Sequence, residues 1–278
     1  MPAAFPPPLN EKGNTVQPGL RVLVLGGTTE ASTLCRKLVT GWPACHAVLS
    51  LAGATRQPHL PDMTTRIGGF GGVQGLTDWL RHNAIHAVVD ATHPFAAQMS
   101  QHAAAACAAA CVPLLRLERP GWKATPHDDW LMVPSITDAA STLAHASRWK
   151  THPQSVFLTT GRKETRPFKE AAQHHYLFRS IDQPEAADLP PHTQVICARG
   201  PFDLAAELQL MRVHNITVLV TKNSGGVATY PKLEAARMLG IPVIMIARPT
   251  GQDTPHAEDA AAALAWLHQC ASSTLRDV

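Results

Sequence analysis

The stretch LRVLVLGGTTEA, residues 20–31, decides how the N-terminal part of this chain folds. Its opening run is mostly apolar, is rich in β-branched residues and lies between Gly19 and Gly26. Such a run is typical of a strand that is buried on both faces of a parallel sheet. Apolar residues then recur at helical spacing over residues 31–39. The stretch therefore predicts a strand, a glycine turn and a helix in direct succession.

The same alternation of strand and helix continues along the chain. We expect further strands at residues 44–52, 64–67, 87–90, 112–116, 155–159, 175–180, 194–198, 218–221 and 242–246. We expect helices at residues 74–83, 94–110, 135–148, 201–214, 232–239 and 257–270. This alternation predicts the α/β class, with parallel sheets covered on both faces. The periodicity lapses near residues 120–134, so we expect two halves with a ligand cleft between them.

The composition excludes several classes of protein. The 278 residues include 24 Lys and Arg against 21 Asp and Glu, and a net charge of +3 does not indicate a binder of nucleic acid or anionic membranes. The longest apolar stretch, residues 103–115, is shorter than the roughly 20 residues of a membrane span. The cysteines and histidines show no metal-binding spacing. Residues 1–18 lack a secretory pattern and are expected to be a disordered lead-in to a cytoplasmic protein without a metal.

The first glycine turn is a candidate phosphate site. Its residues are Gly26, Gly27, Thr28, Thr29 and Glu30, at the end of the first strand and the start of the first helix. Glycines let the backbone approach a phosphate, and the unpaired amides at a helix start favour an anion. The pattern is neither GxGxxG nor a P-loop, so a plain tight turn is the alternative interpretation.

The residues after the second expected strand discriminate between dinucleotides. An NAD site usually carries an acidic residue about 20 positions after the glycines, where it binds the ribose 2′-hydroxyl. No Asp or Glu occurs between Glu30 and Asp62, and Gly53, Thr55 and Arg56 follow the strand instead. A hydroxyl and a guanidinium favour a 2′-phosphate, so NADP(H) is the expected dinucleotide. The alternative is that Arg56 is a solvent-exposed loop residue that binds no ligand.

Two more segments of the first half are candidate ligand contacts. Gly68 and Gly69 belong to TRIGGFGG, residues 65–72, whose backbone can pass close to a flat ligand because it bears few side chains. Asp90, Thr92 and His93 follow a strand, at the edge where α/β sheets bind ligands. Asp90 or Thr92 could instead cap the next helix, and an isolated histidine is more often structural.

The second half contains three basic loops that follow expected strands. They are TGRK at residues 160–163, ARGP at 198–201 and TKNSGG at 221–226. Parallel strands end at one edge of a sheet, so these cations would converge on a polyanionic ligand. Three unrelated solvated cations are the alternative. The chain has neither YxxxK nor GxSxG, which counts against a short-chain dehydrogenase and a serine hydrolase.

Together these segments resemble the precorrin-6A reductase family of cobalamin biosynthesis. The resemblance rests on LVLGGTTEAS (23–32), TRIGGFGG (65–72), DATHPFAAQMS (90–100), LRLERPGW (115–122), ARGPF (198–202) and KNSGG (222–226). It implies two Rossmann-like domains with NADPH and a macrocycle between them, and reduction of one double bond of precorrin-6A to give precorrin-6B. One departure concerns the cofactor. The family pattern leads us to expect Ala-Gly-Arg-Thr, whereas residues 52–56 read AGATR and displace the arginine by two positions.

The resemblance also assigns roles to the two halves. Residues 19–127 become an NADP(H)-binding domain and residues 128–278 a substrate-binding domain. The substrate bears many carboxylates, and its expected contacts are Arg116, Arg119, Lys163, Arg199, Gly200, Lys222, Asn223 and Ser224. A proton must accompany the hydride, and His93 and Lys222 are the candidate donors. Other enzymes of the pathway are further candidate partners.

Two other functions stay open on the residues alone. One is an NADPH-dependent reductase or epimerase that acts on another small molecule. The other is a non-catalytic module that senses NADPH and uses its second half as an interaction surface.

Overall fold

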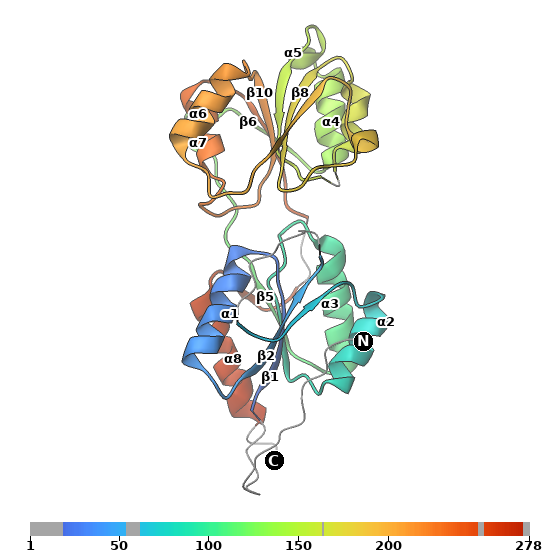
Figure 1. Cartoon of the computed structure of the whole chain (residues 1–278), viewed down its shortest axis with the longest axis vertical. Coiled ribbons are helices and arrows are strands. Elements are labelled where there is room, and N and C mark those ends of the chain that lie inside the picture. Colours follow the sequence, from blue (N-terminus) through green and yellow to red (C-terminus); the bar gives the residue numbers. More distant parts are fainter. Residues whose placement is uncertain (1–18, 54–61, 163, 250–252, 275–278) are drawn as a thin grey trace, which may run out of the picture. The chain divides into compact units, whose positions relative to one another are not determined.

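Two six-stranded parallel sheets organise the chain, as a computed structural model shows for residues 19–53, 62–162, 164–249 and 253–274 (Figure 1). Of the described residues, those up to residue 119 and those from residue 253 onward form the first unit, and those from 120 to 249 form the second unit. The α/β class expected from the alternating pattern is therefore confirmed. Residues 1–18, the expected lead-in, lie outside the described residues.

The sheet of the first unit has the strand order β12-β5-β4-β1-β2-β3. Its strands are β1 (Arg21–Leu25), β2 (His46–Leu51), β3 (Thr65–Ile67), β4 (Ala87–Asp90), β5 (Leu114–Leu117) and β12 (His256–Ala257). Its helices are α1 (Thr29–Gly41), α2 (Gly72–His82), α3 (Ala97–Ala110) and α8 (Ala260–Thr274). Helices α1 and α8 cover one face, and α2 and α3 cover the other (Figure 1). This is the strand order of a dinucleotide-binding Rossmann sheet, which reverses between β1 and β4.

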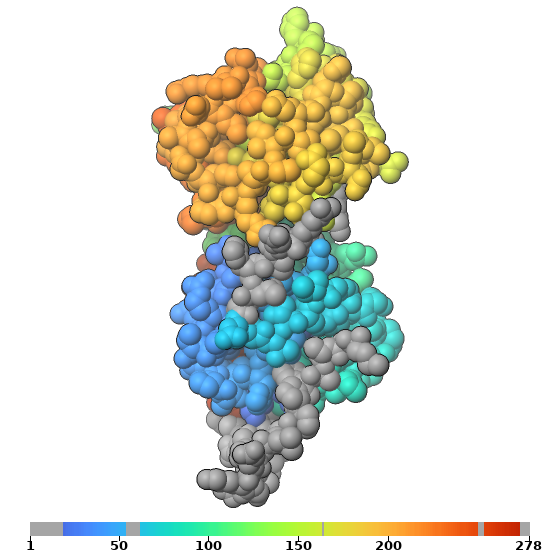
Figure 2. All heavy atoms as spheres, viewed as in Figure 1, coloured from blue at the N-terminus to red at the C-terminus, as the bar shows by residue number. Residues whose placement is uncertain are grey.

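The sheet of the second unit has the strand order β6-β11-β10-β7-β8-β9. Its strands are β6 (Trp130–Val133), β7 (Ser155–Leu158), β8 (His175–Ser180), β9 (Thr193–Cys197), β10 (Val218–Lys222) and β11 (Val243–Ile246). Its helices are α4 (Ile136–His145), α5 (Ser147–Lys150), α6 (Leu204–Val213) and α7 (Pro231–Met238), with 3-10 turns η1 (Arg166–Ala171) and η2 (Ala186–Asp188). Its yellow and orange segments meet on one face in the space-filling view (Figure 2). The strand order reverses between β7 and β10, which therefore flank its ligand edge.

Strand β1 shows why the sequence folds in this way. Val22 and Val24 pack into the core on the side of α1 and α8, whereas Leu23 and Leu25 pack on the side of α2 and α3. All four side chains are buried, and each contributes about 1.5–3 kcal/mol relative to an exposed side chain. A polar substitution on either face would therefore leave an unpaired group inside one of two cores.

The division into units differs from the boundary expected at residues 127/128. Strand β12 pairs with β5, and α8 packs into the same core as α1, so the C-terminal segment completes the first unit. Strand β6 lies inside the expected seam and forms an edge of the second sheet. The two residues of β12 are too few to produce a recognisable alternation. No helix among the described residues is long and apolar enough to cross a membrane.

Candidate functional site

The turn after β1 leaves open space at the edge where the first sheet reverses its order. Gly27 has a φ of +124°, which residues with a side chain rarely adopt, and among the described residues no atom beyond its chain neighbours lies within 4 Å of a Cβ built on it. Gly26 has a different role, because a Cβ there would lie 2.5 Å from Leu49 Cδ1. The sequence therefore needs one glycine for packing and the other for a turn whose backbone a ligand can approach.

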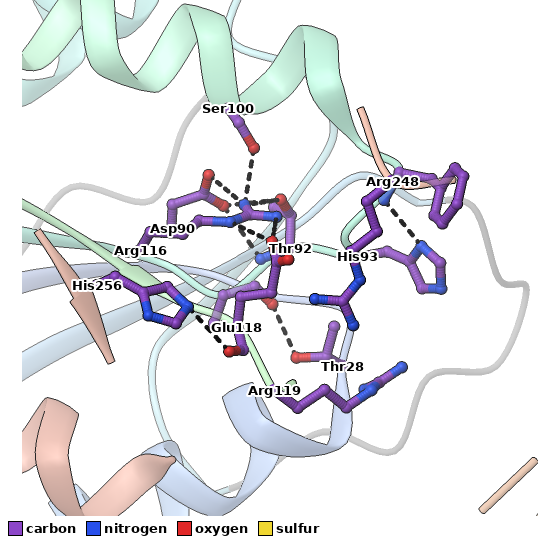
Figure 3. Close-up of polar contacts among 12 residues, drawn as sticks. Thr28, Asp90, Thr92, His93, Ser100, Arg116, Glu118, Arg119, Arg248 and His256 are labelled. Carbon is purple, nitrogen blue, oxygen red and sulfur yellow. Dashed lines mark hydrogen bonds and ion pairs between the residues drawn. The ribbon is translucent and has the colours of Figure 1, made fainter. Parts of the chain in front are cut away.

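Thr28 connects the two loops that flank this edge. Its hydroxyl donates to the carbonyl oxygen of Ala91 at 2.8 Å (Figure 3). The Thr28 hydroxyl oxygen also accepts a hydrogen bond from the amide of Ala31 at 3.1 Å. The first bond crosses from the β1 turn to the loop after β4, and the second caps α1. Thr28 therefore fixes the helix start at the position where Rossmann domains bind a pyrophosphate.

A second open backbone segment follows β3. Gly68, Gly71 and Gly72 have positive φ values of +117°, +84° and +85°, and a Cβ built on any of them meets no atom within 4 Å. Gly69 is equally open. These four positions therefore leave open space beside the backbone, and contact of Gly68 and Gly69 with a ligand stays a prediction.

Arg66 holds this loop in place, and the sequence reasoning did not assign it a role. Its guanidinium donates to the carbonyl oxygens of Gly68 at 3.0 Å and Gly69 at 2.9 Å, and to Ser50 Oγ at 2.8 Å. The guanidinium carbon also lies 3.7 Å from the centroid of the Phe70 ring. Both strands were expected from the sequence, and pairing β2 with β3 makes Ser50 and Arg66 register partners. That pairing could have drawn attention to Arg66.

Asp90 and Arg116 form the buried centre of a polar network at the ends of β4 and β5. Arg116 Nη1 lies 2.5 Å from Asp90 Oδ2, and Nη2 lies 2.7 Å from Glu118 Oε2 (Figure 3). Thr92 and Ser100 add hydroxyls, because Thr92 donates to Asp90 at 2.7 Å and Ser100 accepts from Arg116 at 2.7 Å. The guanidinium is thus shared by two carboxylates, so this geometry favours a positioning role over the predicted substrate contact.

Two other predicted ligand contacts pair with each other. Arg119 Nη1 lies 2.6 Å from Glu30 Oε2. The expected substrate contact Arg119 therefore forms an ion pair with the expected cofactor contact Glu30. This ion pair joins the segment after β5 to the first turn of α1. His93 is half-buried, and its Nδ1 accepts from the amide of Phe95 at 3.2 Å.

Two cations of the basic loops lie beside carboxylates that the sequence analysis did not assign to them. Lys222 forms an ion pair with Glu164, and Arg162 lies 3.9 Å from Asp182. Burial lowers the pKa of Lys222, and the charge of Glu164 opposes that shift. Arg199 is exposed in the loop after β9. The predicted contacts Thr55, Arg56 and Lys163 lie outside the described residues.

Asn223 holds the loop after β10 against the start of the unit. Its Oδ1 accepts from the amide of Trp122 at 2.7 Å, and its Nδ2 donates to the Trp122 carbonyl oxygen at 3.0 Å. The Trp122 indole also donates to Gly226 at 2.9 Å. The amide group of Asn223 is therefore engaged within the protein, and the geometry favours a structural role over the predicted substrate contact.

The loops after β9 and β10 also touch each other. The amide of Phe202 donates to the Ala228 carbonyl oxygen at 3.1 Å, and a Cβ on Gly200 would lie 3.3 Å from that oxygen. Gly200 thus serves a close approach of two backbones. Ser224 is buried within the same region.

Three buried charged side chains, Arg179, Glu207 and Lys232, lie next to these loops. Arg179 of β8 forms a bidentate ion pair with Glu207 of α6, and its guanidinium lies 3.8 Å from the Phe202 ring centroid. Lys232 of α7 is only 5% exposed and donates to Thr159 Oγ1 at 3.2 Å. Burial and the charge of Arg179 lower the pKa of Lys232 to about 7. The sequence showed no sign of this cluster, because its members belong to three separate elements.

No group of three or more His, Cys, Asp or Glu side chains that could hold a metal ion occurs among the described residues. Glycine turns, hydroxyls and ion pairs lie at the ligand edges of the described residues. Glycine turns at the reversal of a parallel sheet suit a dinucleotide, and cationic loops suit an anionic ligand.

Comparison with known proteins decides between the open classes. Residues 21–268 match the family model described as precorrin-6x reductase CbiJ/CobK. The chain belongs to this family. The resemblance inferred from the six sequence motifs is thereby confirmed.

Similar proteins cover nearly the whole chain. A precorrin-6A reductase of Rhodococcus erythropolis is 46% identical over 248 residues, which are 89% of this chain and 97% of the relative. One of Rhodobacter capsulatus is 47% identical over 229 residues, covering 82% and 88% of the two chains. A cobalt-precorrin-6A reductase of Priestia megaterium is 29% identical over 239 residues, with 82% and 90% covered.

A solved structure supports the fold. A structure titled CobK precorrin-6A reductase has a TM-score of 0.82 and 43% identity, and the match covers 90% of this chain and 97% of that chain. The two Rossmann-like parallel-sheet domains are therefore confirmed. The expected cleft between them stays a prediction.

Replacing Asp90 tests the buried network. Asp90→Asn removes the more buried of the two carboxylates that balance Arg116, and we expect the free energy of unfolding to fall by about 3 kcal/mol. Asp129→Asn is the matched control, because Asp129 pairs with Arg148 on the surface with side chains 54% and 50% exposed. We expect that variant to change stability by about 0–1 kcal/mol. Urea unfolding measures both, and equal losses would show that the Asp90 ion pair is not the critical contact.

Lys232 gives a prediction about pH. Its pKa is about 7 in the folded state and near its ordinary value of 10.5 when unfolded, so between these values the unfolded state binds more protons. The free energy of unfolding of the wild type should therefore rise with pH relative to Lys232→Met, by at most about 1.4 kcal/mol per pH unit. Urea unfolding at pH 7, 8 and 9 measures this difference. Lys150→Met, at an exposed lysine, should show no such trend; a flat difference for Lys232→Met would mean that Lys232 stays charged.

Proposed function

We propose that this chain reduces precorrin-6A to precorrin-6B with NADPH in cobalamin biosynthesis. The observation that carries the proposal is the family match over residues 21–268, together with relatives named precorrin-6A reductase that it resembles over most of their length. The open glycine turns at the reversal of the first sheet are consistent with a dinucleotide-dependent reductase. An epimerase or a non-catalytic sensor has no such support.

The residues of the first unit fit a dinucleotide. The open space beside Gly27 and along Gly68 and Gly69 would accept a ligand backbone, and the start of α1 favours its pyrophosphate. We expect NADP(H) and not NAD, because the chain has no acidic residue between Glu30 and Asp62 to bind a free 2′-hydroxyl. When bound, the nicotinamide supplies the hydride; the protein supplies orientation and electrostatics.

The second unit would bind the carboxylates of the macrocycle. Arg199 is exposed and can accept a new partner without losing an ion pair that holds the fold. Lys222 would exchange Glu164 for a substrate carboxylate, since Glu164 is 33% exposed and can turn to water. The exchange keeps a half-buried ammonium paired throughout, which avoids the cost of an isolated charge.

Two side chains can hold the proton that accompanies the hydride. Burial lowers the pKa of Lys222, which makes its ammonium a better proton donor, and a carboxylate beside it opposes that shift by stabilising the charged form. His93 accepts a hydrogen bond at Nδ1, so its neutral ring carries the proton at Nε2 and can donate from that atom. Both remain predicted donors.

The similarity to known proteins favours a metal-free substrate. The relatives named precorrin-6A reductase are 43–47% identical, whereas those named cobalt-precorrin-6A reductase are 29–31% identical. We therefore propose precorrin-6A without cobalt as the substrate. A reaction that uses NADPH fits the cytoplasm, and other enzymes of the pathway stay predicted partners.

Anaerobic turnover tests the proposed function. We expect precorrin-6A and NADPH to give a product heavier by two hydrogen atoms, seen by mass spectrometry and a change in visible absorbance. Losing a charge-assisted contact to the 2′-phosphate costs about 1.5–3 kcal/mol, so kcat/KM should be about 10- to 100-fold lower with NADH. Cobalt-precorrin-6A serves as the parallel substrate. No reduction of either macrocycle would contradict the proposal, and equal use of NADH would contradict the cofactor assignment.

Variants of the basic loops test the substrate site. Arg199→Ala should leave NADPH binding unchanged. It should raise the KM for precorrin-6A more than tenfold if the bound substrate shields the contact from water, where an arginine contributes about 2–3 kcal/mol, and only slightly if the contact stays exposed. Lys222→Ala should raise KM if it binds a carboxylate, or lower kcat alone if it supplies the proton. Arg212→Ala, at an exposed arginine of α6, is the control. Wild-type kinetics in both variants would place the substrate elsewhere.

A further inference from the structure

The guanidinium of Arg66 lies where the second and third strands of the first sheet end. Pairing of β2 with β3 brings Ser50 and Arg66 into register, and Arg66 Nη1 donates to Ser50 Oγ at 2.8 Å. Ser50 is 6% exposed, so this hydroxyl is a fixed acceptor. Stacking on Phe70, at 3.7 Å from the guanidinium carbon to the ring centroid, fixes the plane of the group. Arg66 is therefore held from two sides in one orientation.

The charge of Arg66 is not balanced by a carboxylate of the described residues. Its partners there are the Ser50 hydroxyl and the carbonyl oxygens of Gly68 and Gly69, and none of the ion pairs includes it. Its Nε and the second N–H of Nη2 have no partner among these residues. The group is half-buried, and that burial lowers its pKa. A half-buried cation with donors to spare is stabilised by an anion.

The position of Arg66 identifies the anion. Ser50 also accepts from the amide of Gly26 through its carbonyl oxygen at 2.9 Å, so Ser50 links the phosphate turn to Arg66. In Rossmann domains the end of the second strand lies at the adenosine ribose, whose 2′ substituent distinguishes NADP from NAD. The spare N–H groups of Arg66 therefore belong to the part of the sheet where a 2′-phosphate would bind.

We propose that Arg66, oriented by Ser50 and Phe70, binds the adenosine 2′-phosphate and makes this chain selective for NADP(H). The inference rests on the proposed use of NADPH and names the residue that reads the cofactor. It moves that role from the displaced Arg56, which lies outside the described residues, to an arginine on β3. A planar fork matches two phosphate oxygens, which a lysine cannot do.

Binding of nucleotide fragments tests this inference apart from catalysis. Calorimetry of the full chain with adenosine 2′,5′-bisphosphate and with 5′-AMP isolates the 2′-phosphate, because the fragments differ only in that group. The wild type should bind the bisphosphate at least tenfold more tightly. Arg66→Gln should reduce that ratio at least tenfold while its affinity for 5′-AMP stays within about twofold. Ser50→Ala, which removes only the orienting acceptor, should reduce the ratio less.

Three further variants make the outcomes distinguishable. Arg36→Gln removes an exposed arginine from α1 and should leave the ratio unchanged, which controls for net charge. Arg66→Lys keeps the charge and should still lose most of the selectivity. Loss of selectivity in Arg56→Gln but not in Arg66→Gln would overturn the inference and leave NADP(H) use intact. A loss of affinity for both fragments in Arg66→Gln would overturn it in favour of adenine stacking or loop support.

If the wild type bound adenosine 2′,5′-bisphosphate and 5′-AMP equally well, that result would instead contradict the proposed use of NADP(H). Thermal melting of each variant, without nucleotide, shows whether the fold is retained. Selectivity retained by folded Arg66→Gln and Arg66→Lys would overturn the inference directly.

Discussion

The buried ion pair between Asp90 and Arg116 is the interaction on which the ligand edge of the first unit depends. The two residues are register partners on β4 and β5, so the pair fixes both strand ends at once. Asp90 then holds Thr92, and the carbonyl oxygen of the intervening Ala91 accepts from Thr28, which caps α1. One carboxylate thus sets the geometry of a loop, a turn and a helix start. Burying two charges adds little net stability, but it restricts the arrangement to one geometry in which all partners are satisfied.

The second unit reaches the same end by other contacts. Asn223 bonds the backbone of Trp122 on both sides, Arg179 stacks on the Phe202 ring, and Lys222 pairs with Glu164. A neutral amide therefore acts beside two charged side chains to fix the loop ends. Lys232 has no carboxylate of its own, since Glu207 is engaged by Arg179. Arg179 and Lys232 therefore lie near one buried carboxylate, and that carboxylate already balances the charge of Arg179. A proton on Lys232, whose pKa is about 7, adds a positive charge beneath the ligand edge that favours an anion there.

The sequence predicted those features of the chain that depend on local patterns. Residues 20–31 and the later alternation are sufficient for the α/β class, because buried strands and amphipathic helices have different periods. Glycine positions were informative for the same reason, since Gly27 and Gly68 need backbone angles that other residues rarely adopt. The two-residue β12 has no period to detect, and its pairing with β5 depends on a chain reversal far along the sequence. That is why the C-terminal helix was assigned to the wrong unit.

The partners of the charged side chains could not be predicted from the sequence for a different reason. A cation next to a glycine indicates an exposed loop, but the carboxylate that meets it is chosen by tertiary packing: Arg119 and Glu30 are 89 positions apart. The predicted ligand contacts therefore contain two kinds of residue that look alike in sequence. Arg116 and Asn223 stabilise the loops, whereas Arg199 is exposed and Lys222 pairs with a carboxylate that is one-third exposed. What separates them is the cost of giving up the present partner. Breaking a buried pair costs about 3–5 kcal/mol. Exchanging Glu164 for a substrate carboxylate leaves Lys222 paired, and exposed Arg199 gives up no ion pair, so these two residues can bind a carboxylate without disrupting the fold.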